Sequence, residues 1–281
     1  MKMRSTALIN GTNERKFILF KICFSSVLLF VLILLGVLIK HDWIAVNPEE
    51  RNLKPSLQYL FGTDWLGRDM FYRTLKGLIV SLQVGVVAAF SSTLIALTLS
   101  LLSSWNDSLD RFIRWLIDLF LSIPHLVALL LIAFALGGGI KGVIIGIALT
   151  HWPTLTRLLR GEVKQLQQAE YVQISRQLGR SQLWIVFHHF IPFLLPQVIV
   201  GFILLFPHAI LHEAAITFLG FGIPAELPAI GVILSESMQY LTTGMWWLAF
   251  FPGISLVFVV GLFDRLGSSI QKYFFPYEGK Y

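Results

Sequence analysis

The sequence predicts an all-α membrane protein that crosses a bilayer six times. Hydrophobic residues make up 56% of the 281 positions and charged residues only 14%, whereas about a quarter of a soluble globular chain is charged. The mean hydropathy is +0.72, and the hydrophobic residues form runs of about the length that spans a bilayer. Lys and Arg gather in some connections between these runs and are missing from others. Together these observations indicate a polytopic membrane protein.

The first two expected spans are the cleanest. Residues 22–39 and 78–102 contain no charged side chain, whereas the later spans contain prolines and the third also contains charges. Because proline bends or breaks a helix, we expect a kink at Pro124 in the third span and a bent or broken fifth span. The complete set of expected spans is 22–39, 78–102, 112–136, 142–159, 190–212 and 245–263.

The distribution of Lys and Arg predicts the orientation. Five of these residues lie within 1–21 and five within 157–189, whereas 213–244 contains none. Cytoplasmic connections carry the excess of positive charge, so we expect a cytoplasmic N-terminus at 1–21 and a cytoplasmic tail at 271–281. The first hydrophobic run is longer than a signal-peptide core, and we expect it to be retained as a span. Residues 40–76 then form an extracytoplasmic segment.

Several function classes lack the residues that they require. The chain has no G-x-x-x-x-G-K-[ST] phosphate loop, no Ser/His/Asp constellation and no H-E-x-x-H motif, so we do not expect an enzyme. Residues 137–142 match G-x-G-x-x-G, but they join two membrane spans and no strand precedes them, which argues against a dinucleotide site. Asp64 and Asp69 lie near Arg68 and Arg73, which favours ion pairs over acid–base catalysis. Topology explains the net charge of +6 better than nucleic-acid binding does, and the single Cys23 excludes a disulfide framework.

The connection at residues 169–192 is polar, basic and helix-forming, although it lies between two long hydrophobic runs. Its first part predicts a helix that Gly179 can end in a left-handed conformation. A second helix should follow and stop at Pro192. The hydrophobic positions at helical spacing are Tyr171, Ile174 and Leu178 in the first helix, and Leu183, Phe187 and Phe190 in the second. Because connections are usually short, we expect this cytoplasmic helix–Gly–helix element to dock on a soluble partner rather than to be inert.

His208 and His212 lie four residues apart in the fifth span, so both side chains face the same way, and Glu213 follows. Two imidazoles on one helix face suit a borderline divalent metal ion. The alternative is that they are hydrogen-bonded packing residues. Histidines within a membrane usually face the bundle interior, which favours function. We therefore expect His208, His212 and Glu213 to line a translocation path or to bind metal.

Residues 170–179 read EYVQISRQLG and are followed by Ile185, His189 and Pro192. This pattern resembles the coupling motif of permease subunits of ATP-binding-cassette (ABC) importers in the peptide/nickel branch, which is close to E-Y-V-x-A-A-x-x-x-G and then I-x-x-x-H-x-x-P. Further stretches are similar to segments of the same family, so the resemblance covers nearly the whole chain. These stretches are 61–69 (FGTDWLGRD), 150–160 (THWPTLTRLLR), 218–222 (FLGFG) and 251–253 (FPG).

The resemblance implies the type I ABC importer permease fold, with a permease core at 77–270 and a coupling loop at 160–190. It implies a non-catalytic subunit with no cofactor of its own, in the cytoplasmic (inner) membrane of a bacterium or archaeon. The expected partners are membrane lipid, a second homologous permease subunit, two cytoplasmic ABC ATPases that bind ATP and Mg, and an extracytoplasmic solute-binding protein, with no nucleic acid. The implied coupling residues are Glu170, Tyr171, Val172, Gln173, Ile174, Ser175, Gly179 and Pro192.

The chain departs from the family at the centre of the motif, where E-A-A is replaced by Gln173-Ile174-Ser175. Coupling is therefore expected to rely on shape, aromatic contact and arginines more than on a carboxylate. Residues 211–222 resemble L-H-x-A-x-x-S-F-L-G-L-G of nickel importers, whereas peptide permeases tend to have Ala-Glu-Ala at that place. Together with His208, this favours nickel or a metal chelate as substrate. The alternatives are an importer of di- or oligopeptides and, more remotely, a stand-alone secondary transporter, which would require inverted repeats.

Overall fold

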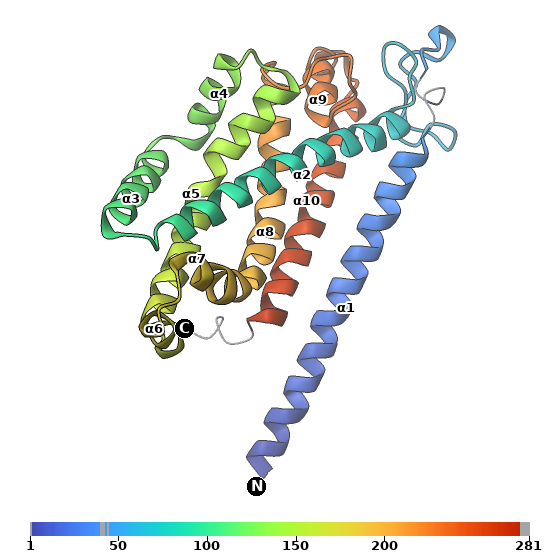
Figure 1. The fold of residues 1–281 in the computed structure, drawn as a ribbon. Coiled ribbons are helices and arrows are strands. Elements are labelled where there is room, and N and C mark those ends of the chain that lie inside the picture. Colours follow the sequence, from blue (N-terminus) through green and yellow to red (C-terminus); the bar gives the residue numbers. More distant parts are fainter. Residues whose placement is uncertain (1, 40–42, 44, 276–281) are drawn as a thin grey trace. The chain divides into compact units, whose positions relative to one another are not determined.

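The computed structural model describes the backbone of residues 2–39, 43 and 45–275, and the side chains of these residues from Arg15 onward. Every named element in this part of the chain is a helix (Figure 1), so the all-α prediction is confirmed. The chain forms two compact units. The first unit comprises residues 1–83 and 213–281, and the second comprises residues 84–212.

In the first unit, a long N-terminal helix, α1, lies beside the last helix, α10. The elements of this unit are α1 (Lys2–Leu38), η2 (Pro48–Glu50), the start of α2 (Met70–Leu102), the end of α8 (Ile191–Phe218), α9 (Ile230–Met238), η4 (Leu241–Thr243) and α10 (Trp247–Phe274). Residues 271–274 of the expected cytoplasmic tail continue α10, and residues 276–281 lie outside the described part.

In the second unit, α3 and α4 both pack against α5, as Figure 1 shows. The unit also contains the rest of α2 and α8. Its other elements are α3 (Asp107–Ser122), α4 (His125–Ala135), α5 (Gly139–Gln168), α6 (Glu170–Gln177), α7 (Gln182–Ile185) and η3 (Val186–Phe190). The hydrophobic core of this unit gathers around Trp152 and Leu159 of α5 and extends to Val172 of α6 and Phe190 of η3.

Five helical stretches of the described chain are long and apolar enough to cross a membrane, and the α3–α4 pair makes a sixth if it counts as one bent span. The six-span prediction is thereby confirmed. The expected kink at Pro124 is also confirmed, because α3 and α4 meet at this residue with a bend of 97°. A proline here cannot donate the hydrogen bond that would continue α3, so the chain turns.

The prolines of the fifth span do not break its helix, although the sequence predicts a bent or broken span. Pro196 and Pro207 lie inside α8, which is one continuous helix, and Pro192 does not stop the helix of the loop. Instead, the chain widens into a π-helical turn at Val186–Phe190, where the N–H of Ile191 reaches the carbonyl of Val186. The wide turn gives the ring of Pro192 room beside the preceding carbonyls, so the helix can run on.

Ion pairs hold the connection between α1 and α2, as the sequence predicts for Asp64. Asp69 instead accepts a hydrogen bond from the backbone N–H of Phe71 at 2.7 Å. The Asp64 carboxylate accepts hydrogen bonds from Nε of Arg68 at 2.7 Å and from Nη1 of Arg73 at 3.2 Å. Arg73 also pairs with Glu236 of α9. Trp65 stacks on Tyr240 with ring centroids 4.5 Å apart. The described part of the segment at 40–76 is therefore a folded cap on the first unit.

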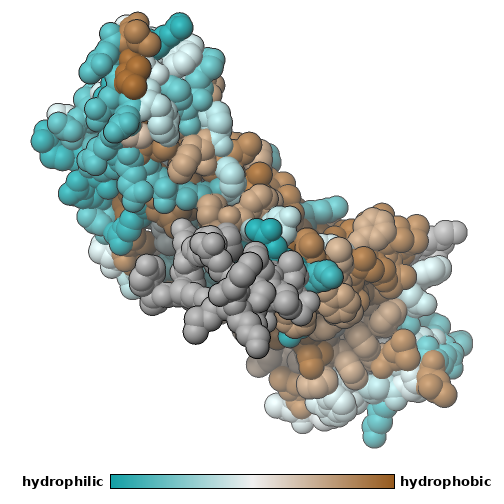
Figure 2. Space-filling view, turned by 90° about the horizontal axis from the view of Figure 1, so that it is seen from below, coloured by the Kyte–Doolittle hydropathy of each residue, from teal (hydrophilic) through white to brown (hydrophobic). Residues whose placement is uncertain are grey.

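Large hydrophobic side chains remain exposed on the spans of both units, for example Phe30 of α1 and Leu131 of α4. On the face seen in Figure 2, hydrophobic and hydrophilic residues gather in separate areas. Exposed apolar surface of this extent is typical of a protein that faces lipid.

Candidate functional site

The helix–Gly–helix prediction for the loop is confirmed. Helix α6 ends at Gln177, and Gly179 adopts a φ of +77°. The N–H of Gly179 donates to the carbonyl of Arg176, and the N–H of Arg180 donates to that of Ser175 at 3.1 Å. This is the Schellman pattern, in which a left-handed residue satisfies the last carbonyls of a helix. Ser181 then caps α7 by accepting from the N–H of Trp184.

Buried residues anchor this loop to the second unit. Val172 of α6, Ile185 of α7 and Phe190 of η3 are fully buried in the hydrophobic core of the unit. Ser175 contacts His189 with 2.9 Å between Oγ and Nε2, so the two halves of the loop are joined directly. The loop is therefore held in a fixed shape by its own side chains.

The opposite face of the loop exposes hydrophobic side chains. Tyr171, Ile174 and Leu178 are all exposed, as the helical spacing predicts, and Leu178 is 75% exposed. Leu183 and Phe187 of the second half are exposed as well. We call these five residues the loop face. The expectation that Phe190 shares a side with Leu183 and Phe187 is wrong, because the π-helical turn changes the angle per residue and directs Phe190 into the core.

Of the remaining residues of the expected coupling motif, three are exposed and one is buried. Glu170 and Gln173 are exposed on α6, and Gln173 donates to the carbonyl of Gln168 at 3.1 Å. Val172 lies underneath and supports the helix. Pro192 is exposed at the start of α8.

A buried carboxylate fixes the end of α5 that leads into the loop. Asp110 of α3 accepts hydrogen bonds from both Nε and Nη2 of Arg160, the latter at 2.8 Å. Nζ of Lys164 lies 2.7 Å from the same carboxylate. Because Asp110 is only 4% exposed, little water competes for it, and the charge-assisted bonds set the position of α5 against α3.

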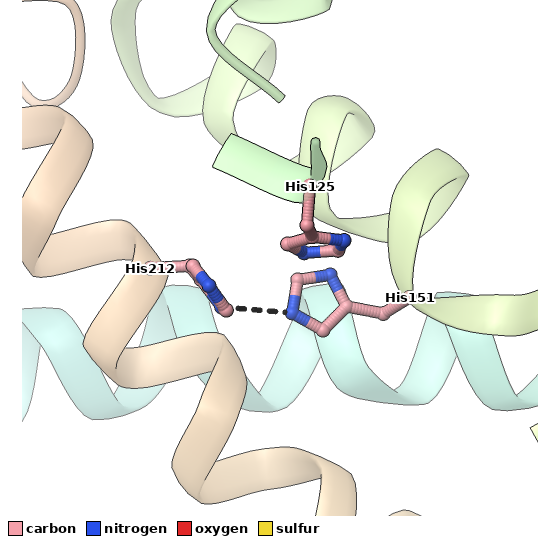
Figure 3. A group of neighbouring side chains, drawn as sticks. All are labelled: His125, His151 and His212. Carbon is pink, nitrogen blue, oxygen red and sulfur yellow. Dashed lines mark hydrogen bonds between the residues drawn. The ribbon is translucent and has the colours of Figure 1, made fainter. Parts of the chain in front are cut away.

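A group of three histidines lies in the second unit. His125 begins α4, His151 lies in the middle of α5, and His212 lies in α8, so three helices contribute one imidazole each (Figure 3). Nε2 of His151 lies 3.1 Å from Nδ1 of His212. The ring of His125 lies 4.3 Å from that of His151 and 4.7 Å from that of His212, between centroids.

The three residues that the sequence predicts for the translocation path, His208, His212 and Glu213, lie in different environments. His212 belongs to the three-histidine group. His208 is exposed, and its carbonyl accepts a hydrogen bond from Nδ1 of His212 at 2.9 Å. Glu213 is fully buried and accepts a hydrogen bond from Thr217 at 2.8 Å. Sequence reasoning missed His125 and His151, although an ionisable residue within a span was a signal available for both.

The chain matches the family described as "Binding-protein-dependent transport system inner membrane component" over residues 92–276. A dipeptide transport system permease protein, DppC of Bacillus subtilis, is 32% identical over 250 residues, which cover 88% of this chain and 78% of the relative. The oligopeptide permease OppC of the same organism is 31% identical, with coverage of 89% and 84%. The glutathione permease GsiD of Escherichia coli is 32% identical, with coverage of 86% and 82%.

The fold is similar to that of a solved ABC importer. A chain of the MetNI methionine ABC transporter in an inward-facing conformation matches with a TM-score of 0.58 and 20% identity, and the match covers 73% of this chain and 97% of that chain. At this identity the likeness shows the fold, which is the ABC importer permease fold that the sequence predicts. The match over residues 92–276 shows more: this chain belongs to the family of inner membrane components of binding-protein-dependent transport systems.

Proposed function

We propose that this chain is the permease subunit of an ABC importer whose cargo is short peptides. The family match supports an inner-membrane transport component that is not itself catalytic. Relatives that match most of the chain are named as dipeptide, oligopeptide and glutathione permeases, and these names support a peptide cargo. The expectation of nickel or a metal chelate finds no support among these relatives.

In this proposal the chain forms half of the translocation path and pairs with a second, similar permease. An extracytoplasmic binding protein delivers the peptide, and two cytoplasmic ATPases bind and hydrolyse ATP with Mg. The N- and C-termini lie in the cytoplasm together with the loop at 160–190. Closure of the ATPases moves α6 and α7, and the anchored loop passes that motion to α5 and α8.

The observation that carries the coupling role is the combination of an exposed hydrophobic face with a buried anchor. A hydrophobic side chain fully transferred from water contributes about 1.5–3 kcal/mol. Ile174 and Leu178 of the loop face are more than half exposed, so covering them would stabilise a docked ATPase. The anchor at Val172 and Phe190 gives the docked helix a rigid connection to the membrane helices. Shape and hydrophobic contact thus replace the carboxylate that Gln173 lacks.

Copurification with the ATPases tests the coupling role. The double variant Ile174→Asp, Leu178→Asp should lose the ATPases, because it places two carboxylates in a hydrophobic contact. Leu57→Asp is the matched control, since Leu57 is 99% exposed and lies in the cap of the first unit. Retention of both ATPases and of transport by the double variant would contradict the docking role of α6.

Uptake by the assembled importer tests the cargo. Proteoliposomes that contain the importer, its binding protein and internal ATP should accumulate a radiolabelled dipeptide. Radioactive nickel offered in the same vesicles measures the alternative. ATP-dependent uptake of nickel without uptake of any di- or oligopeptide would overturn the peptide proposal and leave the importer assignment intact.

A further inference from the structure

We propose that His125, His151 and His212 form a binding site for one divalent transition-metal ion that prefers nitrogen ligands, such as Co²⁺, Ni²⁺ or Zn²⁺. Each residue offers one ring nitrogen, and these three atoms lie within 4.8 Å of one another. Metal–imidazole bonds of about 2.0–2.1 Å in a tetrahedral site place ligand nitrogens about 3.3 Å apart. The three candidate nitrogens exceed this spacing by at most about 1.5 Å, so small side-chain rotations suffice to close the site.

Backbone carbonyls orient two of the three rings. Nδ1 of His151 lies 3.1 Å from the carbonyl oxygen of Ile147, and Nδ1 of His212 lies 2.9 Å from that of His208. A carbonyl can only accept, so each Nδ1 carries the hydrogen and each Nε2 keeps a lone pair for an ion. Metal-binding histidines are commonly held in this way, with the second nitrogen donating to a backbone carbonyl. His208 therefore acts through its backbone, which explains why its side chain need not join the group.

In the described part of the chain, the third ring, that of His125, has a buried nitrogen without a hydrogen-bond partner, which an ion could bind. Nε2 of His125 is buried and has no hydrogen-bond partner among the described residues. A buried polar atom without a partner costs free energy and calls for an explanation, of which an ion is one. The ring also lies against both other imidazoles (Figure 3). Three imidazoles at this distance cannot all be cations without strong repulsion, so the group is best suited to the neutral, ligating form.

The ligand set indicates the class of ion. Imidazole suits Zn, Cu, Ni and Co, whereas Ca²⁺ and Mg²⁺ prefer oxygen ligands. In the described part of the chain the group contains three histidines and no carboxylate, so it would hold a divalent ion without neutralising it. Three protein ligands also leave a fourth position open for a ligand from outside.

The position of His125 fits a ligand site. It is the first residue of α4, directly after Pro124, where the bent α3–α4 pair is broken. Discontinuous membrane helices in transporters commonly surround substrate and ion sites, because irregular backbone within the membrane needs a polar environment. The break therefore places an imidazole where a regular helix would bury an apolar side chain.

Metal binding to the intact importer tests this inference without reference to transport or cargo. The nucleotide-free complex, purified with a tag that contains no histidine, is titrated with Co²⁺ in lipid nanodiscs and followed by equilibrium dialysis and the visible spectrum. Wild type should bind one ion at this site. Loss of a metal-orienting partner already weakens binding about 10–100-fold, so His125→Gln, His151→Gln and His212→Gln should each weaken it at least about 100-fold. His188→Gln, which removes an exposed imidazole outside the group, should leave the Co²⁺ affinity unchanged.

A ligand exchange separates a metal site from a packing cluster. In His125→Cys a thiolate replaces one imidazole, so Co²⁺ binding should persist with a new sulfur-to-cobalt charge-transfer band. Variants that assemble normally with the ATPases but bind Co²⁺ as tightly as wild type would show that the three histidines only pack against one another. A loss of affinity in His188→Gln as large as that in His151→Gln would likewise overturn the assigned ligand set.

Discussion

Replacing Asp64 with asparagine should open the cap of the first unit. The Asp64 side chain is 0% exposed, and it holds two guanidinium groups, those of Arg68 and Arg73. Its Oδ1 also accepts from the backbone N–H groups of Leu66 and Arg68, both at 2.9 Å. Asparagine keeps the size of the side chain but removes the charge and directs N–H groups toward cations. The substitution therefore leaves buried positive charge without its partner.

The magnitude follows from the surroundings. Removing one partner of a buried ion pair costs about 3–5 kcal/mol. Arg73 keeps a second partner in Glu236, so we expect the lower end, about 3 kcal/mol. Since about 1.4 kcal/mol corresponds to a factor of ten, the opened form of the cap should become about 100-fold more populated.

Limited trypsin digestion measures this change, because cleavage after a residue in a folded segment requires local opening. Arg51 is exposed in the cap, and the following N–H of Asn52 donates to the carbonyl of Asp64 at 3.0 Å. Cleavage at this bond should be about 100-fold faster in Asp64→Asn. Glu49→Gln makes the same chemical change at an exposed carboxylate and should have little effect. Cleavage rates within about twofold of one another in the two variants would refute the ion-pair reasoning.

Three further predictions concern backbone conformation and charge. Gly67→Ala should prevent accumulation of the folded chain, because φ is +76° and a Cβ would lie 1.7 Å from the carbonyl oxygen of Asn47; normal levels on a membrane immunoblot would contradict this. Gly179 also has a positive φ, but a Cβ added there would have no heavy atom of the described residues within 4 Å. Gly179→Ala should therefore lower the free energy of unfolding by only about 1–2 kcal/mol and keep the ATPases bound during purification. Complete loss of assembly would argue against a simple strain effect. Asp110→Asn should lower the free energy of unfolding of the importer by about 3 kcal/mol. Arg157→Gln, which breaks an exposed ion pair, should change it by less than about 1 kcal/mol. Equal melting temperatures for these two variants would disprove the anchoring role of Asp110.

Features that depend on neighbouring residues were predictable from the sequence. Hydrophobic length identified the spans, because the bilayer sets how long an apolar helix must be. The turn at Gly179 and the break at Pro124 follow from backbone conformations that these residue types favour or exclude locally. The same reasoning was wrong at Pro192 and Phe190, because a π-helical turn changes both hydrogen bonding and side-chain direction, and no local pattern announces such a turn.

The three-histidine group depends on the packing of helices that are distant in sequence. His125 and His151 belong to different helices, and His212 lies 61 positions beyond His151. The i, i+4 spacing directed attention to His208 instead, since spacing reveals which side chains share a helix face but not which helix that face meets. The contacts between α4 and α5, and the hydrogen bond between His151 of α5 and His212 of α8, bring the imidazoles together. The spacing of residues in the sequence determines which side chains share a face of one helix. A ligand site such as this one forms only where several helices pack together.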